Sequence, residues 1–371
     1  MCLAALLLAG CATETQREPE WPAETIVPTP PAVEVPVPVP APQPRQSPAP
    51  APAPAAAAQT NRIAETWVSL SRWCAGNGIN QACPMTLGPF SAFALNTTNG
   101  AFILRAGSPL AIWDGLDIRL AYAPQLVGGQ PFVHSLDLRK TVQPLVSGGP
   151  LFLQSTNPTI VIDPGHGGED AGTRSVLGHG FERDYTLDWA RRLEPLLTAN
   201  GWQVFLTRTN DTQVSLSNRV AFAEERRANI FLSLHFNSAG SNEREAGLET
   251  YCLTPPGMFS SVTRGFADDP SLVFPNNTFD GQNLQLAMRV HRALLLASGD
   301  RDRGVRRARY LGVLRGQNRP AILIEGGFLS NPLEARRIAD PAYRQRLAEG
   351  VAKALVGLAD RVNRPPEAVA K

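Results

Sequence analysis

The sequence has little excess charge of either sign. Across 371 residues, 35 Lys and Arg face 33 Asp and Glu, which leaves a formal net charge of +2. So small an excess gives no electrostatic basis for binding nucleic acid. The first apolar stretch, MCLAALLLAGCA, is too short to span a bilayer. The zinc-binding motif HEXXH is absent as well.

Proline, by contrast, is abundant, and 14 of the 33 prolines lie between residues 19 and 54. Residues 12–58 are dominated by Pro, Ala and Val, a composition that forms no core and favours polyproline II. At about 3.1 Å per residue, this linker would reach on the order of 100 Å. It is expected to be either a tether that carries the rest of the chain away from an anchor or a passive disordered spacer.

The first residues resemble the end of a bacterial lipoprotein signal. The box LAGC ends at Cys11, so residues 1–11 are expected to be a signal segment and Cys11 the lipidation site. Ala12 after the cysteine resembles outer-membrane sorting in Gram-negative bacteria. We therefore expect an exported protein that faces the periplasm on a lipid anchor in the outer membrane or the cell membrane. The alternative is an ordinary secretory signal with a chance cysteine. Signal segments usually begin with basic residues, and residues 1–11 contain none. This fits a translation start that lies upstream of Met1.

Residues 60–147 contain short strand-like runs broken by Gly, Asn and Pro, which predicts a small β-rich or α+β domain. Residues 67–73 are predicted to form a short helix. The region faintly resembles the small domain at the amino terminus of copper amine oxidases and of some cell-wall enzymes. Such a domain would bind the wall or a partner, or act only in packing. Cys74 and Cys83 close a short loop, and in an exported protein this predicts a disulfide.

From residue 157 to 364, apolar strand-like runs alternate with amphipathic helical segments. This alternation predicts an α/β domain with a twisted, mostly parallel sheet flanked by helices. Residues 254–282 are rich in Pro, Gly and Asn and are predicted to form an irregular loop beside the cleft. Strands are expected at 159–163, 202–207, 230–234, 248–253 and 321–325, and helices at 183–199, 216–227, 283–297 and 342–362.

Three apolar runs of this region end in side chains that bind metals. IVIDPGHGGED places His166 after a strand, FLSLHFNS places His235 at the end of another, and AILIEGGFLSN delivers Glu325. In an open α/β sheet, ligands bind at the edge formed by the carboxyl ends of the strands. Imidazole and carboxylate are the usual ligands of Zn²⁺, and catalytic zinc keeps one position open for water. The pattern therefore predicts metal-assisted hydrolysis.

Spacing alone leaves the third ligand open. Glu169 forms an H-x-x-E pair with His166, as in zinc carboxypeptidases, but such pairs arise often by chance. Glu182 is an alternative, because it starts a predicted helix after a Gly-rich loop. Further candidates nearby are Asp163, Asp170 and His179.

Four segments, in this order, resemble the zinc-dependent N-acetylmuramoyl-L-alanine amidases of type 3: DPGHGGEDAG, FERDYTLDWARRLEPLLTANGWQVFLTR, SLHFNS and RGVRRARYLGVLRGQNRPAILIEGGFLSN. The resemblance covers about 158 to 360. It implies that His166, Glu182 and His235 bind one Zn²⁺ and that Glu325 is the catalytic residue. The implied reaction is hydrolysis of the amide between N-acetylmuramic acid and the L-alanine of the peptidoglycan stem peptide. Glu325 would take a proton from water and pass it to the leaving amine.

Other polar residues have less specific predictions. Asp163, Asp170, His179 and Asn237 are candidates for lining the cleft or orienting the ligands, with loop hydrogen bonding as the alternative for the two aspartates. Arg208 is expected to be a structural ion-pair partner. A basic cluster could attract the carboxylates of stem peptides or form an ordinary solvated surface. The cluster consists of Arg303, Arg306, Arg307, Arg309 and Arg315.

Two other classes of function stay open at this point. One is a zinc peptidase that cuts within the stem peptide with His166, Glu169 and His235. The other is a catalytically inactive protein that binds the cell wall. The sequence does not reveal a protein activator, although one is compatible with it.

Overall fold

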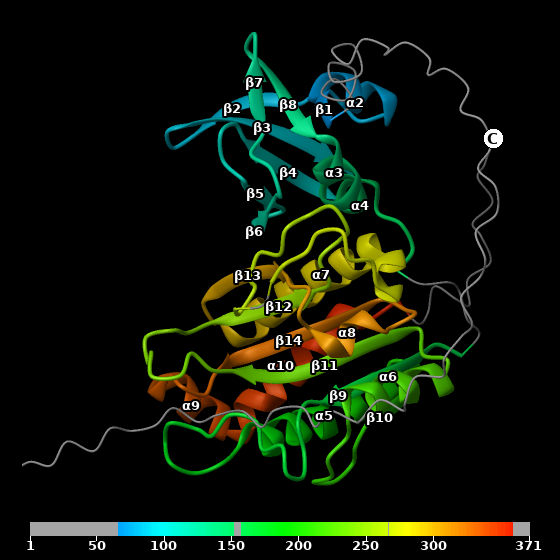
Figure 1. Cartoon of the computed structure of the whole chain (residues 1–371), viewed down its shortest axis with the longest axis vertical. Coiled ribbons are helices and arrows are strands. Elements are labelled where there is room, and N and C mark those ends of the chain that lie inside the picture. Colours follow the sequence, from blue (N-terminus) through cyan, green and yellow to red (C-terminus); the bar gives the residue numbers. More distant parts are fainter. Residues whose placement is uncertain (1–65, 152–156, 266, 359–371) are drawn as a thin grey trace, which may run out of the picture. The chain divides into compact units, whose positions relative to one another are not determined.

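The structure is a computed structural model that describes residues 66–151, 157–265 and 267–358. The predicted signal segment, Cys11 and the proline-rich linker lie outside these residues. The larger part of the fold is a six-stranded sheet with the order β10-β9-β11-β14-β12-β13 (Figure 1). The first four of these strands are parallel, whereas β12 pairs antiparallel with β14 and parallel with β13. The predicted α/β fold with a mostly parallel sheet is therefore confirmed.

The sheet and its helices extend from residue 159 to residue 355. The strands are β9 (Thr159–Pro164), β10 (Gln203–Leu206), β11 (Ile230–Asn237), β12 (Leu248–Cys252), β13 (Asp302–Arg307) and β14 (Ala321–Phe328). The helices are α5 (Glu182–Ala199), α6 (Leu216–Glu225), η2 (Pro275–Phe279), α7 (Asp280–Ser298), α8 (Gly312–Arg315), α9 (Pro332–Ala339) and α10 (Pro341–Leu355).

Helices cover both faces of this sheet, so its central strands β9, β11, β14 and β12 are buried on both sides. Successive side chains of a strand point to opposite faces. Ile160 of β9 packs in the cluster that contains Trp189 of α5. Its neighbour Val161 packs in a second cluster with Ala223 of α6. Two-sided burial explains why these strands read as continuous apolar runs, and it leaves the strand ends as the place for polar side chains.

Residues 67–147 form two small antiparallel sheets and a group of short helices. The five-stranded sheet has the order β2-β3-β4-β5-β6, and the three-stranded sheet has the order β1-β8-β7. The β-rich or α+β prediction is confirmed, but Trp67–Ser69 is strand β1 rather than helix, because it pairs with β8. The elements are β1, α2 (Leu70–Gly76), β2 (Cys83–Leu87), β3 (Phe90–Thr97), β4 (Gly100–Arg105), β5 (Leu110–Trp113), β6 (Leu116–Arg119), β7 (Gln125–Val127), β8 (Gln130–His134), α3 (Ser135–Asp137), η1 (Leu138–Val142) and α4 (Gln143–Ser147).

The predicted disulfide between Cys74 and Cys83 is wrong, because both cysteines are free. Cys74 lies in α2 and is 1% exposed, so its side chain belongs to the core. Cys83 begins β2 and is exposed, with its thiol 3.9 Å from the carbonyl oxygen of Gln81. The short spacing in sequence does not reveal that the two side chains occupy different environments. Cys252 is also free and buried, and burial raises the pKa of its thiol to about 11, as expected for an inert cysteine.

The chain between β12 and α7 is irregular, as predicted. The only regular element described there is the short helix η2, which leads directly into α7. Among the described residues, no helix combines the length and the apolar character needed to cross a membrane.

Candidate metal centre

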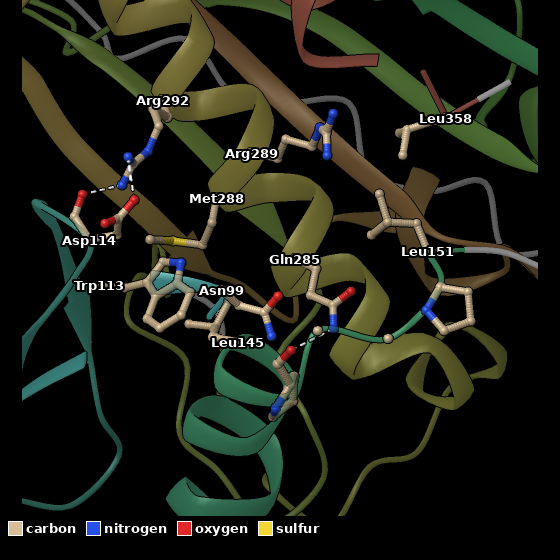
Figure 2. Close-up of a pocket in the computed structure, with 14 residues that line it drawn as sticks. Asn99, Trp113, Asp114, Leu145, Leu151, Gln285, Met288, Arg289, Arg292 and Leu358 are labelled. Atoms are coloured by element: carbon tan, nitrogen blue, oxygen red, sulfur yellow. Dashed lines mark hydrogen bonds and ion pairs between the residues drawn. The ribbon is translucent and has the colours of Figure 1, made fainter. Parts of the chain in front are cut away.

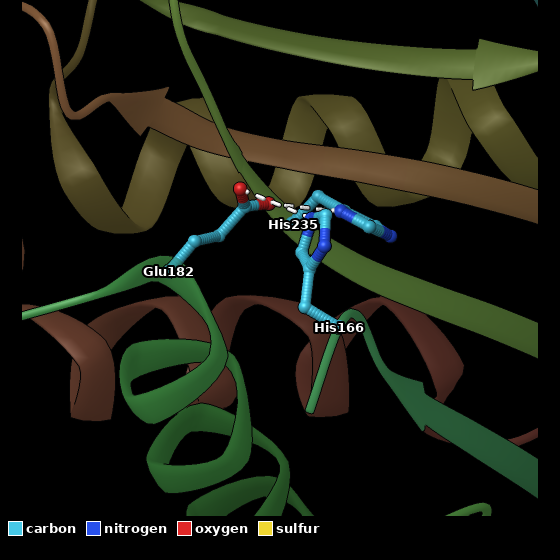
Figure 3. Close-up of side chains that lie close together, drawn as sticks. All are labelled: His166, Glu182 and His235. Atoms are coloured by element: carbon cyan, nitrogen blue, oxygen red, sulfur yellow. Dashed lines mark hydrogen bonds and ion pairs between the residues drawn. The ribbon is translucent and has the colours of Figure 1, made fainter. Parts of the chain in front are cut away.

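Three side chains from separate segments meet at the carboxyl edge of the sheet (Figure 3). His166 follows β9, His235 lies near the end of β11, and Glu182 is the first residue of α5. One ligand atom from each lies within 4.8 Å of the other two. His235 Nδ1 is 2.9 Å from Glu182 Oε1, and His166 Nε2 is 3.1 Å from Glu182 Oε2. Two imidazoles and a carboxylate form a donor set that suits Zn²⁺ with one position left open.

The backbone at this edge is shaped to bring the imidazoles together. His166 has φ 63°, in the left-handed region that residues other than glycine rarely adopt. Arg219 supports this conformation, because its Nη2 donates to the carbonyl oxygen of His166 at 2.8 Å. Gly165 lets His235 pack against the backbone, since a Cβ there would lie 2.2 Å from the imidazole Cε1. Strained backbone of this kind is concentrated at functional sites.

The three side chains interact strongly through charge. Glu182 is 4% exposed, and burial alone would raise the pKa of its carboxyl group. Hydrogen bonds with His166 and His235 nevertheless hold this pKa far below its usual range. Burial would also lower the pKa of His166, whereas the carboxylates of Glu182 and Asp170 raise it to about 9. The space between these side chains therefore stabilises positive charge, whether protons or a metal ion carry it.

Glu325 lies beside this group on the neighbouring strand. It is the register partner of His235 in the parallel pair of β14 and β11. The residue is 7% exposed, and its Oε2 has no hydrogen-bond partner among the described residues. Burial, and then the negative charge of Glu182, raise the pKa of Glu325 to about 8. A buried carboxylate with a free oxygen and a raised pKa is typical of a general acid or base.

The two aspartates near the site differ in what they contact. Asp170 Oδ1 is 2.8 Å from His166 Nδ1, so it can fix the orientation of that ring. Asp163 is buried and touches no member of the trio; it forms an ion pair with Arg219 at 2.5 Å. Asp163 therefore does not line the cleft. It holds Arg219, and Arg219 in turn donates to the carbonyl oxygen of His166.

Two other candidates lie outside the trio. Glu169 is exposed and does not belong to the group that could share an ion, so the geometry favours Glu182 as the third ligand. His179 is exposed, and its Nδ1 lies 3.2 Å from the carbonyl oxygen of Leu177. Asn237 does lie at the site, two residues after His235, and its Nδ2 donates to the Glu249 carboxylate at 2.9 Å.

Sequence reasoning missed Arg219, Glu249 and Arg264, which all contact the surroundings of the trio. Glu249 had a readable signal, since it is an acidic residue inside the apolar run LETYC, and it pairs in register with Glu325. The two arginines have no such signal, because their contacts are with residues far away in sequence. Arg208 is structural as expected, but it donates to backbone carbonyl oxygens, among them Gly165 O at 2.8 Å, and not to a carboxylate.

A pocket of about 590 Å³ lies elsewhere, beside α4 and α7 (Figure 2). Its lining includes the apolar side chains of Trp113, Leu145 and Met288 and the ion pair of Arg292 with Asp114 at 2.5 Å. None of its lining residues belongs to the trio. This lining offers no arrangement for hydrolysis, and the candidate site is therefore the group around His166.

Residues 160–356, just over half of the chain, match the protein family described as N-acetylmuramoyl-L-alanine amidase (Amidase_3). The chain belongs to this amidase family. The matched residues run from β9 to the end of α10 and contain the trio as well as Glu325. The family is metal-dependent, which agrees with the donor set found at the sheet edge.

Curated relatives carry the same description. The chain is 32% identical to N-acetylmuramoyl-L-alanine amidase LytC of Bacillus subtilis (strain 168) over 195 residues, which are 52% of this chain and 34% of that protein. It is 31% identical to N-acetylmuramoyl-L-alanine amidase AmiC of Neisseria meningitidis serogroup B over 214 residues, 53% of this chain and 51% of that protein. The chain thus spans about half the length of these relatives or less.

The solved structures include a similar catalytic domain. CwlV, an N-acetylmuramoyl-L-alanine amidase from Bacillus (Paenibacillus) polymyxa var. colistinus, is 30% identical to this chain. The similarity covers 55% of this chain and 98% of that domain, with a TM-score of 0.46.

Proposed function

We propose that this protein hydrolyses the amide between N-acetylmuramic acid and the L-alanine of the peptidoglycan stem peptide, with one Zn²⁺ held by His166, Glu182 and His235. The observation that carries the proposal is the convergence of these three side chains, from three segments of the chain, beside the buried carboxylate of Glu325. Membership of the amidase family supports the same reaction.

The residues present fit a zinc ion. The ligand atoms would be Nε2 of His166, Nδ1 of His235 and a carboxylate oxygen of Glu182, because these atoms face one another. Asp170 would keep the His166 ring in this orientation through its contact with Nδ1. When bound, the zinc ion supplies a Lewis acid for the scissile carbonyl and makes water a stronger nucleophile at neutral pH.

Glu325 would move the proton in this reaction. Its free Oε2 can accept a proton from the attacking water and return it to the nitrogen of L-alanine as the amide bond breaks. The products are a lactyl carboxylate on the sugar and a stem peptide with a free amino terminus. Burial keeps this carboxylate away from solvent, so the proton is held for the leaving amine.

The test is mass analysis of the material released from purified sacculi. The wild-type protein should release intact stem peptides that begin with L-alanine, and a chelator should stop the release. Glu325→Gln should retain zinc and release stem peptides about 10²- to 10⁴-fold more slowly. Shortened stem peptides would indicate a peptidase instead, and turnover by Glu325→Gln at the wild-type rate would remove Glu325 from the mechanism.

We also propose that the protein is exported and anchored by a lipid on Cys11, facing the periplasm. The sequence LAGC and the long proline-rich linker after it support this proposal. Cell fractionation tests it: the wild-type protein should be found in the membrane fraction, and Cys11→Ala should not be lipidated. An unprocessed or unlipidated wild-type protein would contradict the proposal.

A further inference from the structure

The described residues of the irregular segment between β12 and η2, 253–265 and 267–274, are held together by hydrogen bonds and an ion pair. Asp268 accepts hydrogen bonds from the backbone nitrogen of Ser260 at 2.5 Å and from its hydroxyl at 2.8 Å, and it forms an ion pair with Arg309. The backbone nitrogen of Gly257 donates to Pro270 O at 2.8 Å. These contacts join Ser260 to Asp268 and Gly257 to Pro270, so they fix the base from which Arg264 extends.

Arg264 lies between Ser260 and Asp268 in the sequence and contacts a residue beside the candidate metal centre. Its Nη2 donates to Asn237 Oδ1 at 2.8 Å, and Asn237 follows the proposed ligand His235 by two residues. The guanidinium also lies over the ring of Tyr310, with its Cζ 5.7 Å from the ring centroid. The backbone of Arg264 has φ 47°, an uncommon conformation for a residue with a side chain.

The positive charge of Arg264 interacts with the negative charge of Glu325, but the two side chains form no ion pair. Burial would lower the pKa of Arg264, whereas the negative charge of Glu325 raises it. Among the described residues, none provides a carboxylate in ion-pair contact with Arg264. A guanidinium has five N–H donors in a planar arrangement that matches a carboxylate. The residue is also exposed, so a ligand can reach the remaining donors.

The predicted basic cluster does not offer a comparable group. Arg303 is paired with Glu245 and Glu249, and Arg309 is paired with Asp268. Arg307 donates to Thr141 Oγ1 at 2.9 Å. Arg306 lies 3.7 Å from the Glu249 carboxylate, and Arg315 donates to the carbonyl oxygen of Arg309 at 2.6 Å. These arginines hold parts of the protein to one another, whereas Arg264 is exposed and contacts Asn237 beside the metal centre.

We propose that Arg264 binds a free carboxylate on the peptide side of the scissile amide and so selects acidic stem peptides. This inference rests on the proposed amidase function. Stem peptides carry carboxylates close to the bond that is cut, whereas the neighbouring sugar offers neutral hydroxyl groups. A planar, fixed guanidinium recognises a carboxylate through two parallel hydrogen bonds, which makes Arg264 a specificity-determining residue.

The experiment compares two muramoyl peptides that differ only in the residue after L-alanine, which carries either a free carboxylate or a carboxamide. The wild-type protein should have a higher kcat/KM for the carboxylate form. Arg264→Gln should lower kcat/KM for that form by about 10- to 100-fold, the range expected for hydrogen bonds to a charged group, and by less than about 3-fold for the carboxamide. Arg264→Lys should restore part of the preference.

Arg226→Gln is the matched control, because Arg226 also lies over aromatic rings, those of Phe205 and Phe222. Arg226 stands at the end of helix α6 and is not among the residues of the candidate site. It should leave kcat/KM for both peptides unchanged. An equal loss for both peptides in Arg264→Gln would overturn the proposal, because it would show that Arg264 acts on Glu325 and not on the substrate. Equal use of both peptides by the wild-type protein would overturn it as well.

A binding measurement separates this proposal from the amidase proposal. Calorimetry with the Glu325→Gln variant should show the carboxylate peptide binding at least tenfold tighter than the carboxamide, and adding Arg264→Gln should remove the difference. If this preference is present but the wild-type protein cleaves neither peptide, only the amidase proposal fails. If the preference is absent, the role of Arg264 is refuted whether or not cleavage occurs.

Discussion

Asp163→Asn tests whether a buried ion pair holds the loop that carries His166. The side chains of Asp163 and Arg219 are 1% and 4% exposed, and their charged atoms lie 2.5 Å apart. Asp163 also accepts hydrogen bonds from Thr207 Oγ1 at 2.6 Å and from Ser233 Oγ at 2.8 Å. Asparagine has nearly the same volume, but it removes the charge and replaces one acceptor oxygen with a donor.

The expected loss follows from the burial of Arg219. Removing one partner of a buried ion pair costs about 3–5 kcal/mol, because the other charge stays buried without compensation. Arg219 keeps hydrogen bonds to the carbonyl oxygens of Pro164 at 2.9 Å and His166 at 2.8 Å, so we expect the lower end, about 3 kcal/mol. The pair of Arg292 with Asp114 is 37% and 45% exposed and should contribute at most about 1 kcal/mol.

The assay is urea unfolding followed by tryptophan fluorescence, with Asp114→Asn as the control for the loss of one aspartate charge. Asp163→Asn should lower the free energy of unfolding by about 3 kcal/mol, and Asp114→Asn by less than about 1 kcal/mol. A loss below about 1 kcal/mol for Asp163→Asn would refute the structural role of this ion pair.

Three further predictions concern the site itself. Asp170→Asn should weaken zinc binding by about 10- to 100-fold, because the His166 ring loses its carboxylate partner; unchanged affinity in a zinc competition titration would contradict this. Glu325→Gln should lower kcat on muramoyl peptides by about 10²- to 10⁴-fold while the zinc content stays at one per chain, and a loss of zinc would show that Glu325 is a ligand. Gly165→Ala should lower zinc affinity, because the new methyl group would meet the His235 ring; wild-type zinc content and activity would show that the backbone can shift without cost.

The central strands of the large sheet were predictable because helices bury them on both faces. Burial on both faces favours apolar residues along most of β9, β11 and β14, and such runs are visible in a sequence. β13 was missed because its residues, DRGVRR, are mostly charged, as an edge strand allows. Helix α9 was missed because it ends only two residues before α10 begins.

The candidate site was predictable in part. His166 and His235 stand out because each follows an apolar run, but spacing did not choose between Glu169 and Glu182, and the family resemblance pointed to Glu182. Arg264 could not be found, since its contact with Asn237 joins a loop to a strand 27 residues away. The disulfide prediction failed for a related reason: the distance along the chain between Cys74 and Cys83 says nothing about where their side chains point.

The most direct test of a shared metal site is a crystal structure of the protein grown with zinc, with anomalous diffraction recorded on both sides of the zinc absorption edge. A single anomalous peak should lie about 2.0–2.2 Å from His166 Nε2, His235 Nδ1 and a carboxylate oxygen of Glu182. A peak bound by other residues, or none at this edge of the sheet, would contradict the metal centre and the reaction built on it.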